Sequence, residues 1–244
     1  MLSDFNCQIL NIEKRNNFVS DSLYSDFEQE KRFLCDIERL GSLGFHRLIY
    51  QVPYDPDRDI LSHLNKKIKT VEQSLRKITS RRLSAKFIMR AVLVTYLTDE
   101  TPYLKNIEKT IVPESNYIFL ELPWGHFPDK TAVTINKLLY SNKLLPIFAN
   151  FHLYSALYDA DAVQRLISIK GAGYQFAMKL SVLSENFNII KHIIKNDGIV
   201  LLGSSCDHDN LNISEISKCL EMLQRRLSAK EYAALVLRAR VLIK

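Results

Sequence analysis

Glycine and proline are scarce in this chain, with seven residues of each among 244. Collagen-like and low-complexity disordered proteins contain far more of both, so these two classes are excluded. No apolar run reaches the roughly 18 residues that would span a bilayer, and no charged-then-apolar leader opens the chain. We therefore expect a cytoplasmic globular protein without membrane insertion. Its hydrophobic content of 47% is enough to build a substantial core.

Cysteine is also sparse, and its four positions are Cys7, Cys35, Cys206 and Cys219. None of them forms a CxxC pair, which argues against a structural zinc site and against a disulfide framework. We expect buried free thiols instead. The chain also lacks a glycine-rich phosphate loop, a GxSxG nucleophile motif and a cysteine–histidine signature.

Positive charge is in modest excess, with a net charge of +6 and a sequence pI near 9.0. Such a balance weakly favours an anionic partner. The densest basic cluster, between positions 66 and 82, is interpreted as the solvated face of a helix, with an anion-binding patch as the alternative. We expect no nucleic-acid partner.

The segment 116–154 predicts the local architecture. Positions 116–122 form an apolar run rich in β-formers, and positions 144–149 form a second one. Between them, positions 130–141 carry apolar residues at helical spacing, so the segment predicts a βαβ unit of a parallel sheet. Functional residues lie at the carboxyl ends of the strands in such sheets. Those ends are positions 123–127 and the polar loop expected at 150–154.

The same alternation runs through the whole chain and gives about seven strands, so we expect one parallel α/β domain over residues 1–244. Ser228 and Glu231 form a capping box before the last helix. The other strands are expected at 4–10, 45–52, 87–97, 172–177 and 198–203, and the main helices at 24–40, 61–78, 102–109, 161–170, 184–196, 213–224 and 228–242.

The block NYIFLELPWGHFP followed by LLYSNKLLPIFANFHLY resembles the NYxLxEL…KGxxPxxAHPERY block of a known family. That family is the capsular-polysaccharide-type, manganese-dependent protein-tyrosine phosphatases of the polymerase and histidinol phosphatase (PHP) superfamily. DFNCQIL, LIYQVPYDP, VTYLTDE and GIVLLGSSCDH resemble the family's ligand-bearing strands in the right order. The resemblance implies a single distorted (β/α)7 TIM-like barrel of PHP type, with a trinuclear metal site at the strand ends.

The residues at the family's metal-ligand positions differ in this chain. The histidine pair of the first strand corresponds to Asn6 and Gln8, and the acidic residue of the next loop to Lys14 or Arg15. The histidine that follows Thr-Pro corresponds to Tyr54. Neutral side chains of this kind bind metal ions poorly, and a cation at position 14 or 15 would repel them.

The later ligand positions are replaced as well. The bridging glutamate corresponds to Thr95, and the histidine and arginine of the HPER loop to Asn150 and Leu153. The final aspartate and histidine correspond to Ser205 and Asp207. We therefore expect no metal cofactor. The degenerate pocket is expected to comprise Asn6, Gln8, Tyr54, Thr95, Asn150, His152, Ser205, Asp207 and His208, with anion contacts from Lys14, Arg15 and His126.

Three residues or groups at the strand ends each leave two interpretations open. His152, Asp207 and His208 follow two strands and could together hold one metal ion, or they could be ordinary polar residues at the rim. His126 in the WGHFP loop could contact a ligand or face solvent. Trp124 and Tyr54 could line the mouth of the pocket or cover the top of the barrel.

The resemblance implies a function in bacterial capsule or exopolysaccharide biosynthesis. The first hypothesis is a pseudo-phosphatase, a binding or regulatory protein that binds the tyrosine-rich tail of a bacterial tyrosine kinase or oligomerises with an active paralogue. The alternative is an active phosphoester hydrolase with a metal site rebuilt around His152, Asp207 and His208. A third hypothesis is that the chain is an evolutionary relic that keeps only a structural role.

Overall fold

In the computed structural model the strands form one parallel, sequentially ordered set. Each strand pairs with the next along the chain, and the three-residue β1 also pairs with β7, so the order of pairing returns to its start. The parallel α/β architecture predicted from the sequence is confirmed. The strands are β1 (Gln8–Leu10), β2 (Arg47–Tyr54), β3 (Phe87–Val94), β4 (Tyr117–Leu120), β5 (Leu145–Phe148), β6 (Gly173–Ala177) and β7 (Ile199–Ser204). The structure describes residues 8–10, 35, 38–45, 47–54, 62, 64–66, 68–69, 87–94, 108–204, 212–239 and 242.

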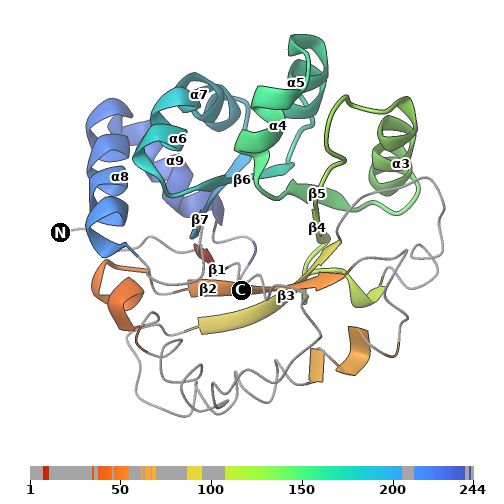
Figure 1. Ribbon diagram of the computed structural model, residues 1–244, viewed down its shortest axis with the longest axis horizontal. Helices are drawn as coiled ribbons and strands as arrows, with labels where there is room; N and C mark the ends of the chain where they lie inside the picture. Colours follow the sequence, from red (N-terminus) through yellow and green to blue (C-terminus); the bar gives the residue numbers. More distant parts are fainter. Residues whose placement is uncertain are drawn as a thin grey trace.

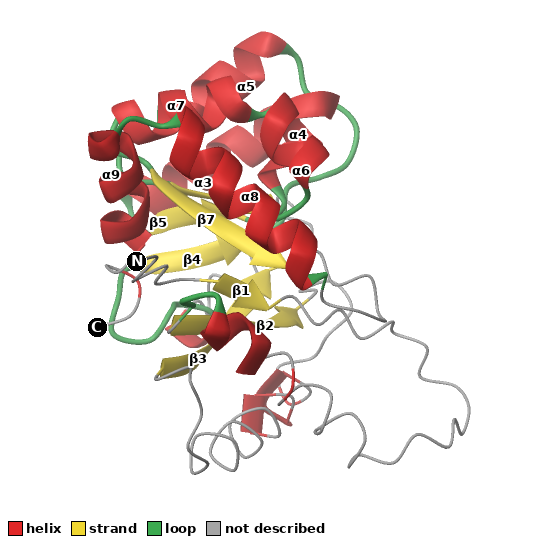
Figure 2. Ribbon diagram, turned by 90° about the vertical axis from the view of Figure 1, so that its left-hand side faces the viewer, coloured by secondary structure: helices red, strands yellow, loops and turns green. Residues whose placement is uncertain are grey.

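The helices of the second half of the chain cover the outside of strands β4 to β7 (Figures 1 and 2). These helices are α3 (Asp129–Tyr140), α4 (Phe151–Leu157), α5 (Ala160–Ile167), α6 (Leu180–Glu185), α7 (Phe187–Lys195), α8 (Ile213–Arg226) and α9 (Ala229–Ala239). In the first half, helical residues are described at 35, 38–42, 62, 64–66 and 68–69. They lie inside the two helices predicted there, except that the first helix ends at 42 rather than at 40. No described helix is long and apolar enough to cross a membrane.

Two apolar clusters lie on the two faces of the strands. The smaller cluster takes alternate strand residues, among them Ile49, Phe119, Ile147 and Leu201, and its members contact one another on the inner face. Gly173 belongs to this face, where an added Cβ would come within 2.9 Å of Ile147. A side chain at this position would therefore crowd the inner core.

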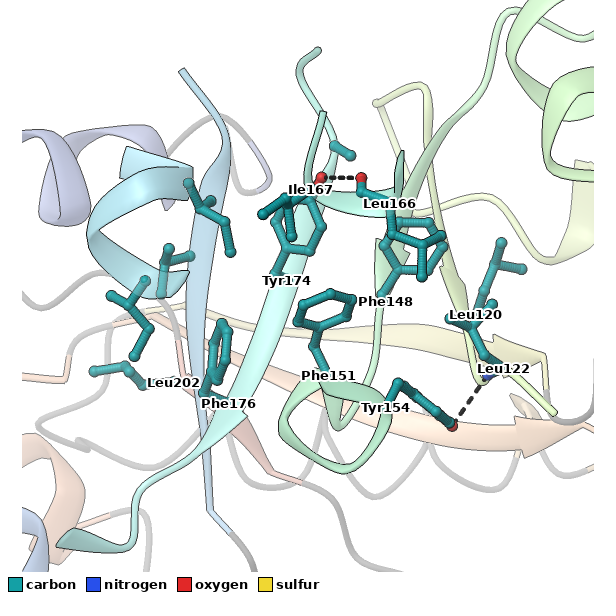
Figure 3. Packing of buried hydrophobic residues seen from close by; sticks show 14 of the residues in the cluster. Leu120, Leu122, Phe148, Phe151, Tyr154, Leu166, Ile167, Tyr174, Phe176 and Leu202 are labelled. Atoms are coloured by element: carbon teal, nitrogen blue, oxygen red, sulfur yellow. Dashed lines mark hydrogen bonds between the residues drawn. The ribbon is translucent and has the colours of Figure 1, made fainter. Parts of the chain in front are cut away.

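The larger cluster fills the space between the strands and the helices (Figure 3). Its centre is aromatic: the Phe151 ring lies 5.0 Å from Tyr174 and 5.9 Å from Phe176, centroid to centroid. Tyr174 also donates its hydroxyl to the carbonyl oxygen of Leu166 at 2.7 Å. These contacts fix α4 and α5 against β6.

One sequence prediction is wrong at the end of β5. The polar loop expected at 150–154 is the first turn of the helix α4. Phe151, Tyr154 and Tyr158 are spaced three and four residues apart and are all buried, so they form the inward stripe of this helix. The polar residues between them concealed that stripe.

The helix predicted at 184–196 is a second correction. The structure has two helices there, α6 and α7, which meet at the buried Asn186. Its amide nitrogen donates to the Val182 carbonyl at 2.9 Å, and its amide oxygen accepts from the Ser155 hydroxyl at 2.6 Å. Asn186 thus ends one helix, begins the next and ties both to α4.

Two smaller predictions have clear outcomes. The capping box is confirmed, since the Ser228 amide donates to a Glu231 carboxylate oxygen at 2.9 Å and the Glu231 amide donates to the Ser228 hydroxyl at 3.3 Å. The prediction of buried thiols holds for Cys219 but is wrong for Cys35, which is exposed. The other two cysteines lie outside the described residues.

Tyr154 provides a test of how α4 is attached. Its phenolic oxygen accepts a hydrogen bond at 3.0 Å from the backbone amide of Leu122, just beyond β4. Tyr154→Phe would leave that buried N–H without its acceptor, so we expect the free energy of unfolding to fall by about 1–3 kcal/mol in chemical denaturation. Tyr140→Phe is the matched control, because Tyr140 is 80% exposed. Equal losses in both variants would contradict this attachment.

Candidate functional site at the strand ends

The carboxyl ends of all the strands lie on the same side of the sheet, because every strand pair is parallel. Three described connections leave from this side: 121–128 after β4, 149–150 after β5 and 178–179 after β6. Sequence analysis placed the functional residues on the first two of these. The third contributes Lys179, which it did not single out.

The connection after β4 carries an aromatic group. Trp124 is 53% exposed, and its ring meets the edge of Tyr154 with centroids 6.5 Å apart. The Tyr158 hydroxyl donates to the Pro123 carbonyl at 2.5 Å, and burial raises the pKa of this hydroxyl, so it remains a donor. These contacts hold the backbone before Trp124 and one side of its ring, while about half of its surface is open to solvent at the rim.

His126 follows Trp124 in the same loop. Gly125 between them has a φ of +94°, a conformation that favours glycine, and the chain turns outward there. His126 is exposed. The solvent-facing alternative fits this position, and contact with a ligand at the rim stays a prediction.

Asn150 stands at the junction of β5 and α4. Its backbone is left-handed, with φ 51° and ψ 39°, a conformation that asparagine tolerates better than most residues. Its side chain makes no capping hydrogen bond to the helix, while its carbonyl oxygen accepts from the Leu153 amide at 2.9 Å. The amide group of Asn150 is thus half-buried at the rim and not used to cap the helix.

His152 lies in the first turn of α4 and is half-buried. Its Nδ1 is enclosed by protein and has no hydrogen-bond partner. Burial, and then the positive charge of Lys179, lower the pKa of His152 from its usual 6.5 to about 4. At neutral pH this part of the rim therefore combines an uncharged imidazole with a nearby ammonium group, and the Glu215 carboxylate accepts a hydrogen bond at 3.2 Å from the Leu180 amide, next to Lys179.

Of the other residues predicted for the pocket, the structure describes only Tyr54 and Gln8. Tyr54 ends β2 and is buried in the larger core cluster, beside residues such as Val94 and Leu122. Gln8 opens β1, where its backbone pairs with Leu48 and Leu202. Asn6, Lys14, Arg15, Thr95, Ser205, Asp207 and His208 lie outside the described residues.

The structure also brings together two residues that sequence analysis missed. Gln51 of β2 and Gln175 of β6 are both fully buried, and the Gln51 amide nitrogen donates to the Gln175 amide oxygen at 3.3 Å. A signal was present in the sequence, since each glutamine interrupts an apolar strand. Their separation of 124 positions hid the contact between them.

The described donors at the strand ends do not suit a divalent metal centre. The part of the chain that the structure describes contains no group of three or more histidine, cysteine, aspartate or glutamate side chains that could hold a metal ion. Glu121, the buried residue that follows β4, supplies one carboxylate, but Asn150 and Tyr54 are neutral and the charge of Lys179 beside His152 opposes a cation. These residues do not fit the trinuclear site that the family resemblance implies.

Comparison with known proteins places the fold. No family model and no curated protein matches the chain. It is similar to a solved chain from the crystal structures of YwqE from Bacillus subtilis and CpsB from Streptococcus pneumoniae, which are metal-dependent tyrosine phosphatases. The TM-score is 0.60, the sequence identity is 12%, and 87% of each chain is covered. At this identity the similarity shows a shared fold.

The pKa of His152 generates a prediction. The folded protein keeps His152 neutral down to about pH 4, while the unfolded chain takes up the proton near its usual 6.5. The free energy of unfolding should therefore fall as the pH drops from 6.5 towards 4, by roughly 1 kcal/mol once solvent screening of a half-buried group is allowed for. His152→Gln should remove that part of the slope in denaturation curves measured across this range.

The matched control for that experiment is His126→Gln, which makes the same change at an exposed loop position. It should keep the slope of the unmodified protein. A slope that is the same in all three proteins would show that His152 takes up its proton equally well in the folded chain.

Proposed function

We propose that this protein is a non-catalytic relative of the metal-dependent tyrosine phosphatases and acts as a binding protein. The main support is the fold shared over 87% of the chain, together with the strand ends, where the described residues contain no group of three or more side chains that could hold a metal ion and Lys179 lowers the pKa of His152. The replacement of the family's ligands by Asn6, Gln8, Thr95 and Ser205 supports the same proposal.

The proposal extends to the architecture. We take the strand order, with β1 paired to β7, as the distorted (β/α)7 TIM-like barrel of the PHP superfamily, in a single domain over 1–244. Asn6, Thr95, Ser205, Asp207 and His208 should then gather at the same end as Asn150. A crystal structure with Asn6 at the opposite end would contradict this.

The ligand proposed for the rim is an anionic, tyrosine-containing peptide. Lys179 with the neutral His152 supports binding of a negative group, and Lys14 or Arg15 would add charge if it closes over the rim. Leu153 stands where the family resemblance expects the arginine of the HPER loop, so no bidentate phosphate clamp forms there. Affinity should therefore be weak and sensitive to salt.

A bacterial tyrosine kinase tail is the source of such a peptide that the resemblance favours, within a cytoplasmic capsule or exopolysaccharide system. An active paralogue as an oligomeric partner is the alternative. Neighbouring genes would support this setting if they encode a tyrosine kinase or glycosyltransferases.

The first test is catalytic. With manganese supplied, hydrolysis of a generic phosphomonoester should not exceed that of a buffer blank, because no ligand set is present to activate a metal-bound water. The purified protein should also contain no stoichiometric manganese or zinc. A metal-dependent rate that His152→Ala or Asp207→Ala abolishes would instead establish the rival function, an active hydrolase with a rebuilt site.

The second test is binding. Trp124 is the single tryptophan of the chain and stands at the rim, so its fluorescence reports on ligands there. A phosphorylated tyrosine-rich peptide should bind more tightly than its unphosphorylated form, and less tightly at high salt. The double variant Lys14→Ala with Arg15→Ala should weaken binding further, by several-fold.

The charge-matched control for this titration is Lys218→Ala with Lys230→Ala, at exposed positions of α8 and α9. It should bind like the unmodified protein. Equal affinity for both peptides, or no binding to either at millimolar concentration, would remove the proposed function.

A further inference from the structure

The amide pair Gln51–Gln175 is the one described side-chain pair in which both partners are polar, uncharged and almost fully buried, at 0% and 1% exposure. The two amides share one long hydrogen bond of 3.3 Å, from the Gln51 nitrogen to the Gln175 oxygen. The amide oxygen of Gln51 has no hydrogen-bond partner at all. An acceptor buried without a partner costs about 1–3 kcal/mol of stability.

The position of the Gln175 amide relative to the strand ends is set by its contact with Gly203. A Cβ added to Gly203 would come within 2.3 Å of the Gln175 amide nitrogen, so that amide occupies the space a side chain would fill. Gly203 is the penultimate residue of β7, and its partner in the register is Ala177, the last residue of β6. The Gln175 amide therefore lies beside Gly203, two residues before the end of β6, and brings its partner Gln51 close to the strand ends.

A pair with only a structural purpose would not be expected to keep an unmet acceptor. The inner face around it is apolar, with Ile49, Phe119, Ile147 and Leu201 in one cluster, and a leucine or methionine would pack there without any unmet polar atom. Polar groups that cost stability are characteristic of functional sites. The position of the pair, beneath the rim formed by Asn150 and His152, agrees with such a site.

We propose that Gln51 and Gln175 form the floor of the strand-end site and bind a peptide or carboxamide N–H of the ligand through the free oxygen of Gln51. This inference rests on the proposed function and names the neutral part of the ligand that the site takes. To meet the ligand, the Gln51 amide has to turn towards the strand ends beside Ala177, whose side chain is a single methyl group, because the Gln175 amide already fills the space at Gly203.

The chemistry of the free atom selects the ligand group. An amide oxygen accepts hydrogen bonds and carries partial negative charge, so it repels phosphate and carboxylate oxygens and attracts N–H groups. Negative groups of the same ligand belong instead beside Lys179 and His152. The floor and the rim thus bind different ends of one peptide.

The experiment uses the full chain and a neutral probe, N-acetyltyrosinamide, with its fully N-methylated analogue as the probe that lacks N–H donors. Binding is followed by the NMR signals of the glutamine side-chain amides. The unmodified protein should bind the first probe and shift the Gln51 signal, and should bind the second at least about tenfold more weakly, since loss of one such hydrogen bond is worth roughly that factor.

The double variant Gln51→Met with Gln175→Met replaces both partners by apolar groups of similar shape. It should unfold at the same or a higher denaturant concentration and lose at least about tenfold in affinity for N-acetyltyrosinamide. Gly203→Ala displaces the Gln175 amide and should weaken binding in the same direction. Gln224→Met, at an exposed position of α8, is the matched control and should change neither property.

Three results would overturn the inference: a double variant that is less stable but binds the probe normally, equal affinity for the two probes, or a crystal structure with a water molecule on the Gln51 oxygen that stays in place at saturating probe. Failure of the proposed function is recognised separately, because it is measured with the charged peptide and its salt dependence, whereas this probe carries no charge.

Discussion

The packing of α4 against strands β4 to β6 is the contact on which the candidate site depends. Phe151 inserts between the aromatic rings of β5 and β6, and Tyr154 holds the backbone just beyond β4. This seven-residue helix is short, so its position follows from burial of these two rings rather than from intrinsic helix propensity. This packing fixes the helix, and His152 on it lies near Lys179. Tyr154 of the same helix contacts the ring of Trp124.

Charge distribution at the rim follows from the same packing. Enclosure of the imidazole and the nearby ammonium both oppose a proton on His152 and a cation beside it. The described rim combines neutral hydrogen-bonding groups with the Lys179 ammonium and the buried Glu121 carboxylate that follows β4. Under the function proposed above, this set binds an anion weakly and does not activate water.

The strands were readable from the sequence because each is a short, nearly continuous apolar run, and the βαβ unit at 116–149 matches the structure to within a residue or two. The helix α4 was not predicted. Its buried residues Phe151 and Tyr154, and Tyr158 just after it, alternate with polar residues in a segment that the family resemblance presents as a loop. The break at Asn186 depends on Ser155 of another element, which no local pattern contains. The amide pair Gln51–Gln175 joins β2 to β6, two strands that are 124 positions apart in the sequence at this contact, so it could be found only in three dimensions.

The central claim is that the strand ends bind a peptide without cleaving it. The most direct measurement follows one sample of protein, manganese and a phosphorylated tyrosine-rich peptide, with Trp124 fluorescence for binding and mass spectrometry for the state of the peptide. We expect a saturable, salt-sensitive fluorescence change and a peptide that keeps its phosphoryl group. Release of phosphate that requires manganese would contradict it.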